Sequence, residues 1–176
     1  MKIPRITWAA YGLAILVIVL DQGSKAAVLS MADVSGIEQI PPGYLFAEVI
    51  PGLFNLTMVR NTGVSFGLFG GGEARWLLSL FSILVAGALA FWALKADRRL
   101  LISAIGLIIG GAIGNAIDRI QYGYVVDFLD FSGTGVFPWV FNIADSAISI
   151  GVVLLILDSF VSDRQAAKLG AAPEKS

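Results

Sequence analysis

Long apolar stretches separated by short polar segments dominate this chain. A helix that crosses the hydrocarbon core of a bilayer, about 30 Å thick, needs roughly 20 mostly apolar residues. The segments 76–94 and 100–117 contain no charged residue, and two further apolar stretches contain only a few. We therefore predict a mainly α membrane protein with four transmembrane helices, near residues 8–29, 76–94, 100–117 and 143–161.

The segment between the first two helices, residues 30–75, is too long to be structureless in a compact protein. Proline–glycine turns interrupt it, and apolar and polar residues alternate from Phe54 to Met58, as in a half-buried strand. We expect a small β element with a loop on the outer (periplasmic) face. A single domain should cover residues 1–163, with 164–176 as a polar, disordered cytoplasmic tail.

Basic residues predict the orientation, because Lys and Arg are enriched in cytoplasmic loops. Most of the twelve basic residues lie at one end of the predicted helices, namely Lys2, Arg5, Lys95, Arg98, Arg99, Arg164, Lys168 and Lys175. Both termini should thus be cytoplasmic. The N-terminal segment also resembles a cleavable signal peptide, but its apolar run continues to Ser30 without a clear cleavage site, which favours a retained helix.

The third helix carries a row of small residues. Gly106, Gly110 and Gly114 recur every four residues, with Gly111 beside them. In a membrane such spacing lets helix backbones approach closely. We interpret this row as a packing surface of the bundle rather than as part of a reaction site.

The composition excludes several kinds of chemistry. The 176 residues are 57% hydrophobic and 14% charged, and they include neither His nor Cys. A Ser–His–Asp triad, a thiol nucleophile, a disulfide and a Cys/His zinc site are therefore excluded. Proton transfer must fall to Asp, Glu, Lys or Tyr. The net charge of −1 gives no basis for nucleic-acid binding.

Several polar residues in the predicted helices lie at one depth. With a helical rise of 1.5 Å per residue, Asp21, Asn115 and Asp145 lie about 20, 22 and 24 Å from the cytoplasmic end. Asp118 and Arg119 follow one turn beyond Asn115. Charges inside a membrane are costly and indicate a functional site. The sequence thus predicts a site near the outer edge of the hydrocarbon.

Each of these polar residues also has a structural interpretation. Asp21 and Lys25, four residues apart, can pair on one helix face. Asn142 is placed to cap the fourth helix, and Arg119 could reach the lipid headgroups. Asp130 fits a solvated position in a loop.

Asp127 is harder to explain structurally, because Val125-Val126 and Phe128-Leu129 flank it with apolar residues. Together with Asp145 it could form a pair of carboxylates that share one proton. The anionic member can deprotonate water while the protonated member polarises a carbonyl group. Spacing alone does not establish that the two acids meet.

Five motifs resemble those of bacterial lipoprotein signal peptidase (signal peptidase II). They occur in the family's order, as Asp21-Gln22-Gly23-Ser24-Lys25, Asn61-Thr62-Gly63, Gly114-Asn115-Ala116-Ile117-Asp118-Arg119, Val125-Val126-Asp127-Phe128 and Phe141-Asn142-Ile143-Ala144-Asp145-Ser146. The resemblance implies a membrane aspartic endopeptidase of the bacterial inner membrane. Such an enzyme removes signal peptides from prolipoproteins by cutting before a diacylglyceryl-modified Cys.

The resemblance also implies roles for individual residues. Asp127 and Asp145 match the catalytic pair. Positions that surround the pair and hold substrate backbone match Asn61, Asn115, Arg119 and Asn142. Positions that organise the site match Asp21, Lys25 and Asp118. We expect no metal or other cofactor, a monomer, and contact with membrane lipids.

Two other functions fit the intramembrane acids. Such acids mark ion paths in transporters, although here they cluster at one face and no pair of broken helices indicates inverted repeats. Asp21, Asp118, Asp127 and Asp145 could instead hold a metal in a lipid hydrolase. Flux in vesicles would distinguish the first alternative, and sensitivity to chelators the second.

Overall fold

The computed structural model describes residues 5–63 and 73–170, with side chains described as far as residue 162. Lys2 and Lys175, which contributed to the predicted orientation, lie outside the described residues. Arg164 and Lys168 lie on a described helix whose side chains at those positions are not described.

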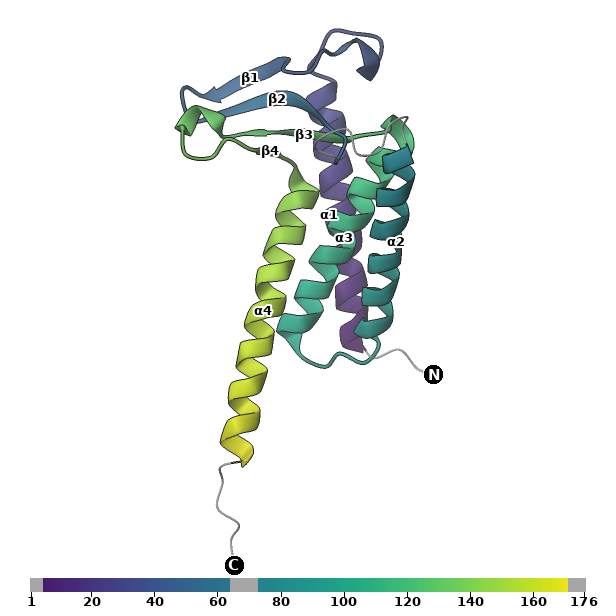
Figure 1. Cartoon of the computed structure of the whole chain (residues 1–176), viewed down its shortest axis with the longest axis vertical. Coiled ribbons are helices and arrows are strands. Elements are labelled where there is room, and N and C mark those ends of the chain that lie inside the picture. The colour runs from purple at the N-terminus through teal and green to yellow at the C-terminus, as the bar shows by residue number, and fades with distance from the viewer. Residues whose placement is uncertain (1–4, 64–72, 171–176) are drawn as a thin grey trace, which may run out of the picture.

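Four long helices form the body of the described chain (Figure 1). They are α1 (Arg5–Leu29), α2 (Glu73–Ala93), α3 (Arg99–Tyr122) and α4 (Ile143–Gly170). Each contains a stretch long and apolar enough to cross a membrane. The prediction of a mainly α membrane protein with four spanning helices is confirmed.

Two helix ends differ from the prediction. The third helix continues past residue 117 to Tyr122, where Gly123 adopts a left-handed conformation with φ of 85° and ends it. Asp118 and Arg119 are therefore helical. The fourth helix continues past residue 161 to Gly170, so the start of the segment expected to be a disordered tail is helical. Its residues Gln165-Ala166-Ala167-Lys168-Leu169 are good helix formers, which explains the extension.

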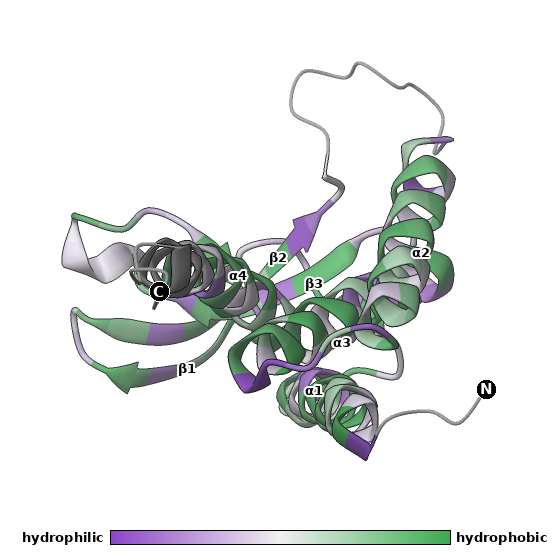
Figure 2. Cartoon of the chain, turned by 90° about the horizontal axis from the view of Figure 1, so that it is seen from below, coloured by the Kyte–Doolittle hydropathy of each residue, from purple (hydrophilic) through white to green (hydrophobic). Residues whose placement is uncertain are grey.

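Helix α3 occupies the centre of the bundle and packs against the other three helices (Figure 2). Of its most apolar stretch, 72% is buried, compared with 17 to 28% for the other helices. The outward faces of α1, α2 and α4 are apolar and exposed, as lipid-facing surfaces are. Asn115 and Asp118 on α3 are consequently enclosed by protein.

The glycine row on α3 makes this central position possible. A Cβ atom on Gly110 would lie 2.6 Å from Cβ of Val17 on α1, and one on Gly106 would lie 2.7 Å from the carbonyl oxygen of Ala10. Gly111 faces α4, where its Cβ would collide with the carbonyl oxygen of Ala144. The predicted packing role is thus observed on two sides of α3.

A four-stranded antiparallel sheet lies across one end of the bundle and projects beyond α4 (Figure 1). Its strands, in spatial order, are β1 (Leu45–Ile50), β2 (Phe54–Asn61), β3 (Val125–Asp130) and β4 (Val140–Phe141). Short 3-10 helices, η1 (Ile37–Gln39) and η3 (Ser132–Thr134), lie in the connections.

The expected β element within residues 30–75 corresponds to β1 and β2. The sequence did not predict β3 and β4, which follow the third helix and extend the same sheet. In the β2–β3 ladder, Val59 lies opposite Asp127. Because side chains alternate along a strand, Asn61 lies on the same face as Val59 and diagonally across from Asp127.

Replacing Gly110 by Ala should destabilise the protein. In a helix interior Ala is normally favoured over Gly by about 0.5–1 kcal/mol, but here the added methyl group forces α1 and α3 apart, at a cost of about 1–3 kcal/mol. Thermal unfolding in detergent micelles should show a lower melting temperature. Gly87→Ala on α2 is the matched control, because no atom lies within 4 Å of its added Cβ. Equal melting temperatures for the two variants would contradict this account.

Candidate active site

The two acids singled out in the sequence lie on adjoining elements at the sheet end of the bundle. Asp127 is in β3 and is 1% exposed, and Asp145 is in the first turn of α4. Asn142, immediately before α4, accepts a hydrogen bond on its Oδ1 from the backbone N–H of Asp145, at 2.8 Å. The predicted cap is therefore present, and it fixes the first turn that carries Asp145.

Two side-chain amides hold the carboxylate of Asp127. Nδ2 of Asn61 donates to Oδ2 at 2.9 Å, and Nδ2 of Asn142 donates to Oδ1 at 2.7 Å. Asn142 thus caps α4 with its oxygen and binds β3 with its nitrogen. The cap is therefore present together with a contact to Asp127, while the role of Asn142 in holding substrate stays a prediction.

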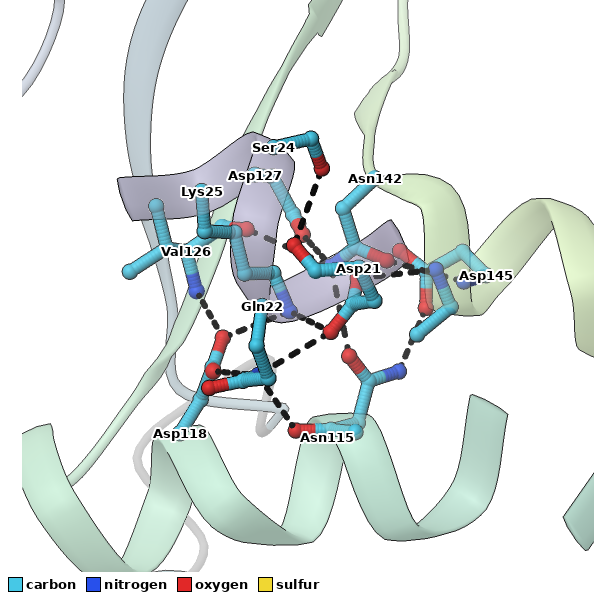
Figure 3. A network of polar contacts seen from close by, with 12 residues as sticks. Asp21, Gln22, Ser24, Lys25, Asn115, Asp118, Val126, Asp127, Asn142 and Asp145 are labelled. Carbon is cyan, nitrogen blue, oxygen red and sulfur yellow. Dashed lines mark hydrogen bonds and ion pairs between the residues drawn. The ribbon is translucent and has the colours of Figure 1, made fainter. Parts of the chain in front are cut away.

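Asn115 on α3 extends this network to the second acid (Figure 3). Its Oδ1 accepts from Nδ2 of Asn142 at 3.2 Å, and its Nδ2 donates to Oδ1 of Asp145 at 2.7 Å. A continuous path of side-chain hydrogen bonds therefore runs from Asp127 through Asn142 and Asn115 to Asp145. The spacing of the sequence did not establish whether the two acids meet, and the geometry shows that they belong to one hydrogen-bond network.

The surroundings of Asp127 favour its protonated form. Burial raises the pKa of this carboxyl group to about 7, with a further contribution from the charge of Asp145. Hydrogen bonds from Asn61 and Asn142 and the charge of Lys25 lower the pKa but do not outweigh burial. A group with a pKa near 7 can gain or lose a proton at neutral pH, as an acid–base catalyst must.

A second, charged cluster adjoins this amide network. Nζ of Lys25 lies 2.8 Å from Oδ2 of Asp21 and 2.7 Å from Oδ2 of Asp118, and all three side chains are at most 3% exposed. The predicted pairing of Asp21 with Lys25 is present. The second carboxylate, from α3, could not be assigned to Lys25 from the sequence.

Gln22 was not identified as a site residue by sequence reasoning. Its Nε2 donates to Oδ1 of Asp118 at 2.8 Å and to the carbonyl oxygen of Gly114 at 3.2 Å. A polar residue beside Asp21 in an apolar helix was the available signal. Gly114 is also more than a packing residue, since its missing side chain leaves room for the Asp21 carboxylate.

Arg119 lines an apolar groove beside the network, and it forms no ion pair with an acid among residues 5–63 and 73–162. The groove has a volume of about 300 Å³ and lies between α2, α3 and α4. Ser82, Asn115 and Arg119 provide its polar lining, and the other lining residues are Leu78, Phe81, Val85, Ile108, Ala112 and Ile148. Nη1 of Arg119 makes one long contact, at 3.4 Å, with the carbonyl oxygen of Asn115. Among the described residues its Nε, which is buried, has no hydrogen-bond partner.

A second apolar pocket adjoins Asp145. Its volume is about 380 Å³, and it is lined by Phe137, Phe141, Asp145, Ser146, Ser149 and Ile150. Asp145 therefore borders this pocket while its hydrogen bonds connect it to the amide network. An extended apolar molecule with a polar central group could contact both hollows and place that group at the acids.

The assignment of Asp130 to a solvated loop position is wrong. Asp130 is the last residue of β3 and is only 6% exposed. It accepts hydrogen bonds from Oγ1 of Thr57 at 2.7 Å and from the backbone N–H of Ser132 at 2.9 Å. These contacts fasten the end of the strand and lie outside the network described above.

The four acids considered as metal ligands are not arranged as a metal site. Within residues 5–63 and 73–170, no group of three or more His, Cys, Asp or Glu side chains is placed to hold a metal ion. Asp21 and Asp118 bind Lys25 instead.

Comparisons with known proteins agree with one another. Residues 13–161 match the model of the family described as signal peptidase (SPase) II. A lipoprotein signal peptidase of Caulobacter vibrioides is 52% identical over 165 residues, 93% of each chain, and one of Tolumonas auensis is 44% identical over 85% of this chain and 88% of the relative. A solved structure described as a bacterial membrane enzyme at 2.3 Å matches with a TM-score of 0.71 and 30% identity, over 96% of this chain and 93% of that one.

The raised pKa of Asp127 predicts a pH-dependent stability. The folded state holds this proton up to about pH 7, whereas the unfolded chain releases it near pH 4. The stabilisation is therefore complete below about pH 4 and is lost as the pH rises to 7, by about 4 kcal/mol at most. Melting temperatures in detergent should fall over this range for the unmodified chain and more weakly for Asp127→Asn. Parallel pH profiles would show that Asp127 titrates normally.

Proposed function

Because the chain belongs to the signal peptidase II family, it is a protease that removes signal peptides from prolipoproteins, and we propose that Asp127 and Asp145 perform the cleavage as an aspartic pair. One observation carries this proposal: the path of hydrogen bonds through Asn142 and Asn115 that joins the two carboxylates. Such a pair needs neither His nor Cys, and the chain contains neither.

In the proposed reaction Asp127 begins protonated, in accordance with its pKa near 7, and Asp145 begins as the anion. Asp145 takes a proton from water, whose oxygen attacks the scissile carbonyl carbon, while Asp127 gives its proton to the carbonyl oxygen. The tetrahedral intermediate then collapses: Asp145 gives the proton it took from water to the leaving nitrogen, the C–N bond breaks, and Asp127 takes back a proton from a hydroxyl group of the intermediate. The products are a signal peptide with a new carboxyl group and a mature chain with a free amino group.

We further propose that the cleaved bond precedes a Cys carrying a diacylglyceryl group. An apolar groove and an apolar pocket border the amide network and Asp145, and they offer separate surfaces for a signal segment and for acyl chains. Arg119, at the sheet end of the groove, can donate to the backbone carbonyl groups of the substrate. Asn61 and Asn115 would act as supports that hold the carboxylates.

The proposed location is the bacterial inner membrane, with both termini in the cytoplasm and the sheet end at the outer leaflet. The arrangement of basic residues at the end opposite the sheet supports this orientation, since Lys95, Arg98 and Arg99 all follow α2 there. We propose that residues 1–163 act as one unit and that the protein works as a monomer without a metal.

Asp127→Asn and Asp145→Asn should each lower kcat by about 10³-fold or more, because Asn keeps the size of Asp but can neither accept nor supply the proton. The assay follows cleavage of a diacylglyceryl-modified prolipoprotein by purified protein in lipid bicelles. Asp33→Asn, at an exposed position, is the control and should retain normal turnover. Near-normal turnover by either site variant would overturn the aspartic mechanism.

Lipidation of the substrate should determine whether it is cut. Acyl chains bound beside Asp145 would hold the scissile bond at the depth of the acids, so removing them should reduce kcat/KM by about 100-fold. The measurement compares one precursor with and without its diacylglyceryl group, in the same bicelles. Equal cleavage of the two forms would refute the specificity while leaving the aspartic mechanism intact.

A further inference from the structure

The burial of the charged cluster of Asp21, Lys25 and Asp118 has an unfavourable desolvation free energy. Removing charges from water costs several kcal/mol for each ion, and apolar replacements of buried ion pairs are often as stable. The side chains of all three residues are at most 3% exposed. Stability alone is therefore a poor explanation for this cluster, and its remaining contacts indicate what it does.

Each carboxylate of the cluster binds the backbone immediately before one of the two site acids. Oδ1 of Asp21 accepts from the N–H of Ala144 at 2.9 Å, and Ala144 precedes Asp145. Oδ2 of Asp118 accepts from the N–H of Val126 at 3.0 Å, and Val126 precedes Asp127. The two contacts are equivalent, although they involve α4 in one case and β3 in the other.

Lys25 joins these two contacts. One ammonium group binds both carboxylates, so the backbone before Asp145 and the backbone before Asp127 are connected through a single cation (Figure 3). We propose that Lys25 is a positioning residue that sets the spacing of the two catalytic aspartates through the carboxylates it bridges. This inference rests on the proposed function of the pair.

The geometry of α1 makes it suitable as the fixed reference. Asp21 and Lys25 lie one turn apart on the same face of a continuous helix, so their separation is set by the helix itself. Gln22 adds a second connection from α1 to Asp118, at 2.8 Å. The segment that carries Asp127 and the segment that carries Asp145 are thus both connected to the same helix, α1.

Charge strengthens this arrangement. Carboxylates accept shorter and stronger hydrogen bonds from backbone N–H groups than neutral oxygens do. A misplacement of about 1 Å can cost about 10²-fold in rate even when substrate binding is unchanged. Loss of the bridge should therefore affect kcat much more than KM.

The test begins with Lys25→Met, assayed on a diacylglyceryl-modified precursor in lipid bicelles. We expect kcat to fall by about 10²-fold, with KM within about threefold of the unmodified value. The matched control is Arg98→Met, which breaks the ion pair with Asp158 at the opposite end of the bundle, where Nη2 and Oδ2 lie 2.7 Å apart. The control should retain normal kcat.

Two further variants distinguish positioning from stability. The triple variant Lys25→Met/Asp21→Asn/Asp118→Asn removes all three charges, so it should recover the melting temperature lost in Lys25→Met. Its kcat should stay at least about tenfold low, because the two segments are no longer bridged. Gln22→Met keeps every charge and removes one hydrogen bond from Asp118, so it should lower kcat by a few-fold with only a small fall in melting temperature.

The outcomes separate the two proposals. If the unmodified chain fails to cut the lipidated precursor, the proposed function fails. If the chain and Arg98→Met both cut it, but the triple variant recovers normal kcat together with its melting temperature, Lys25 only stabilises the fold and the positioning role is overturned. Should Lys25→Met not accumulate, the triple variant and Gln22→Met decide, and normal kcat in both overturns the role.

Discussion

The structure depends on one constraint: a polar group in a hydrocarbon environment must find its partner within the protein. Lys25 meets this constraint by binding two carboxylates, those of Asp21 and Asp118. These carboxylates in turn accept hydrogen bonds from backbone N–H groups of α4 and β3. A single buried cation is consequently connected, through two carboxylates, to the first residues of a strand and of a helix. The sheet end of the bundle thus contains this charged cluster in addition to a small apolar core that includes Ile40, Met58 and Val126.

The close approach of the helices is a precondition for that cluster. Gly106 and Gly110 bring α1 against α3, and without this contact Lys25 could not reach a carboxylate on α3. At Gly114 the space freed by the missing side chain holds the carboxylate of Asp21. The polar network therefore depends on the packing by small residues, because the charged side chains can meet only where the helices approach closely.

The sequence predicted the helices and the common level of Asp21, Asn115 and Asp145 along them, because both depend on local properties: apolar length and helical rise. It did not predict β3, since Val125 to Asp130 is a short apolar run around an acid, with no clear period. Nor could it predict that Lys25 binds Asp118 or that Asn142 binds Asp127, because such pairs depend on helix rotation and strand register. The end of α3 could have been predicted from Gly123, because glycine often ends a helix. The prediction instead ended the helix where the uncharged run ends, at residue 117.

The separation of neutral amides from charged groups has a chemical consequence. Asn61 and Asn142 contact Asp127 directly, whereas the cation of Lys25 is held by other carboxylates. A cation in direct contact with a carboxyl group lowers its pKa by about 1–3 units, which would strip Asp127 of its proton at neutral pH. Amides orient the carboxyl group while leaving its pKa near 7. The cation of Lys25 is bound to Asp21 and Asp118, whose contacts reach only the backbone before each acid. The network can therefore hold Asp127 in place while the carboxyl group keeps its proton.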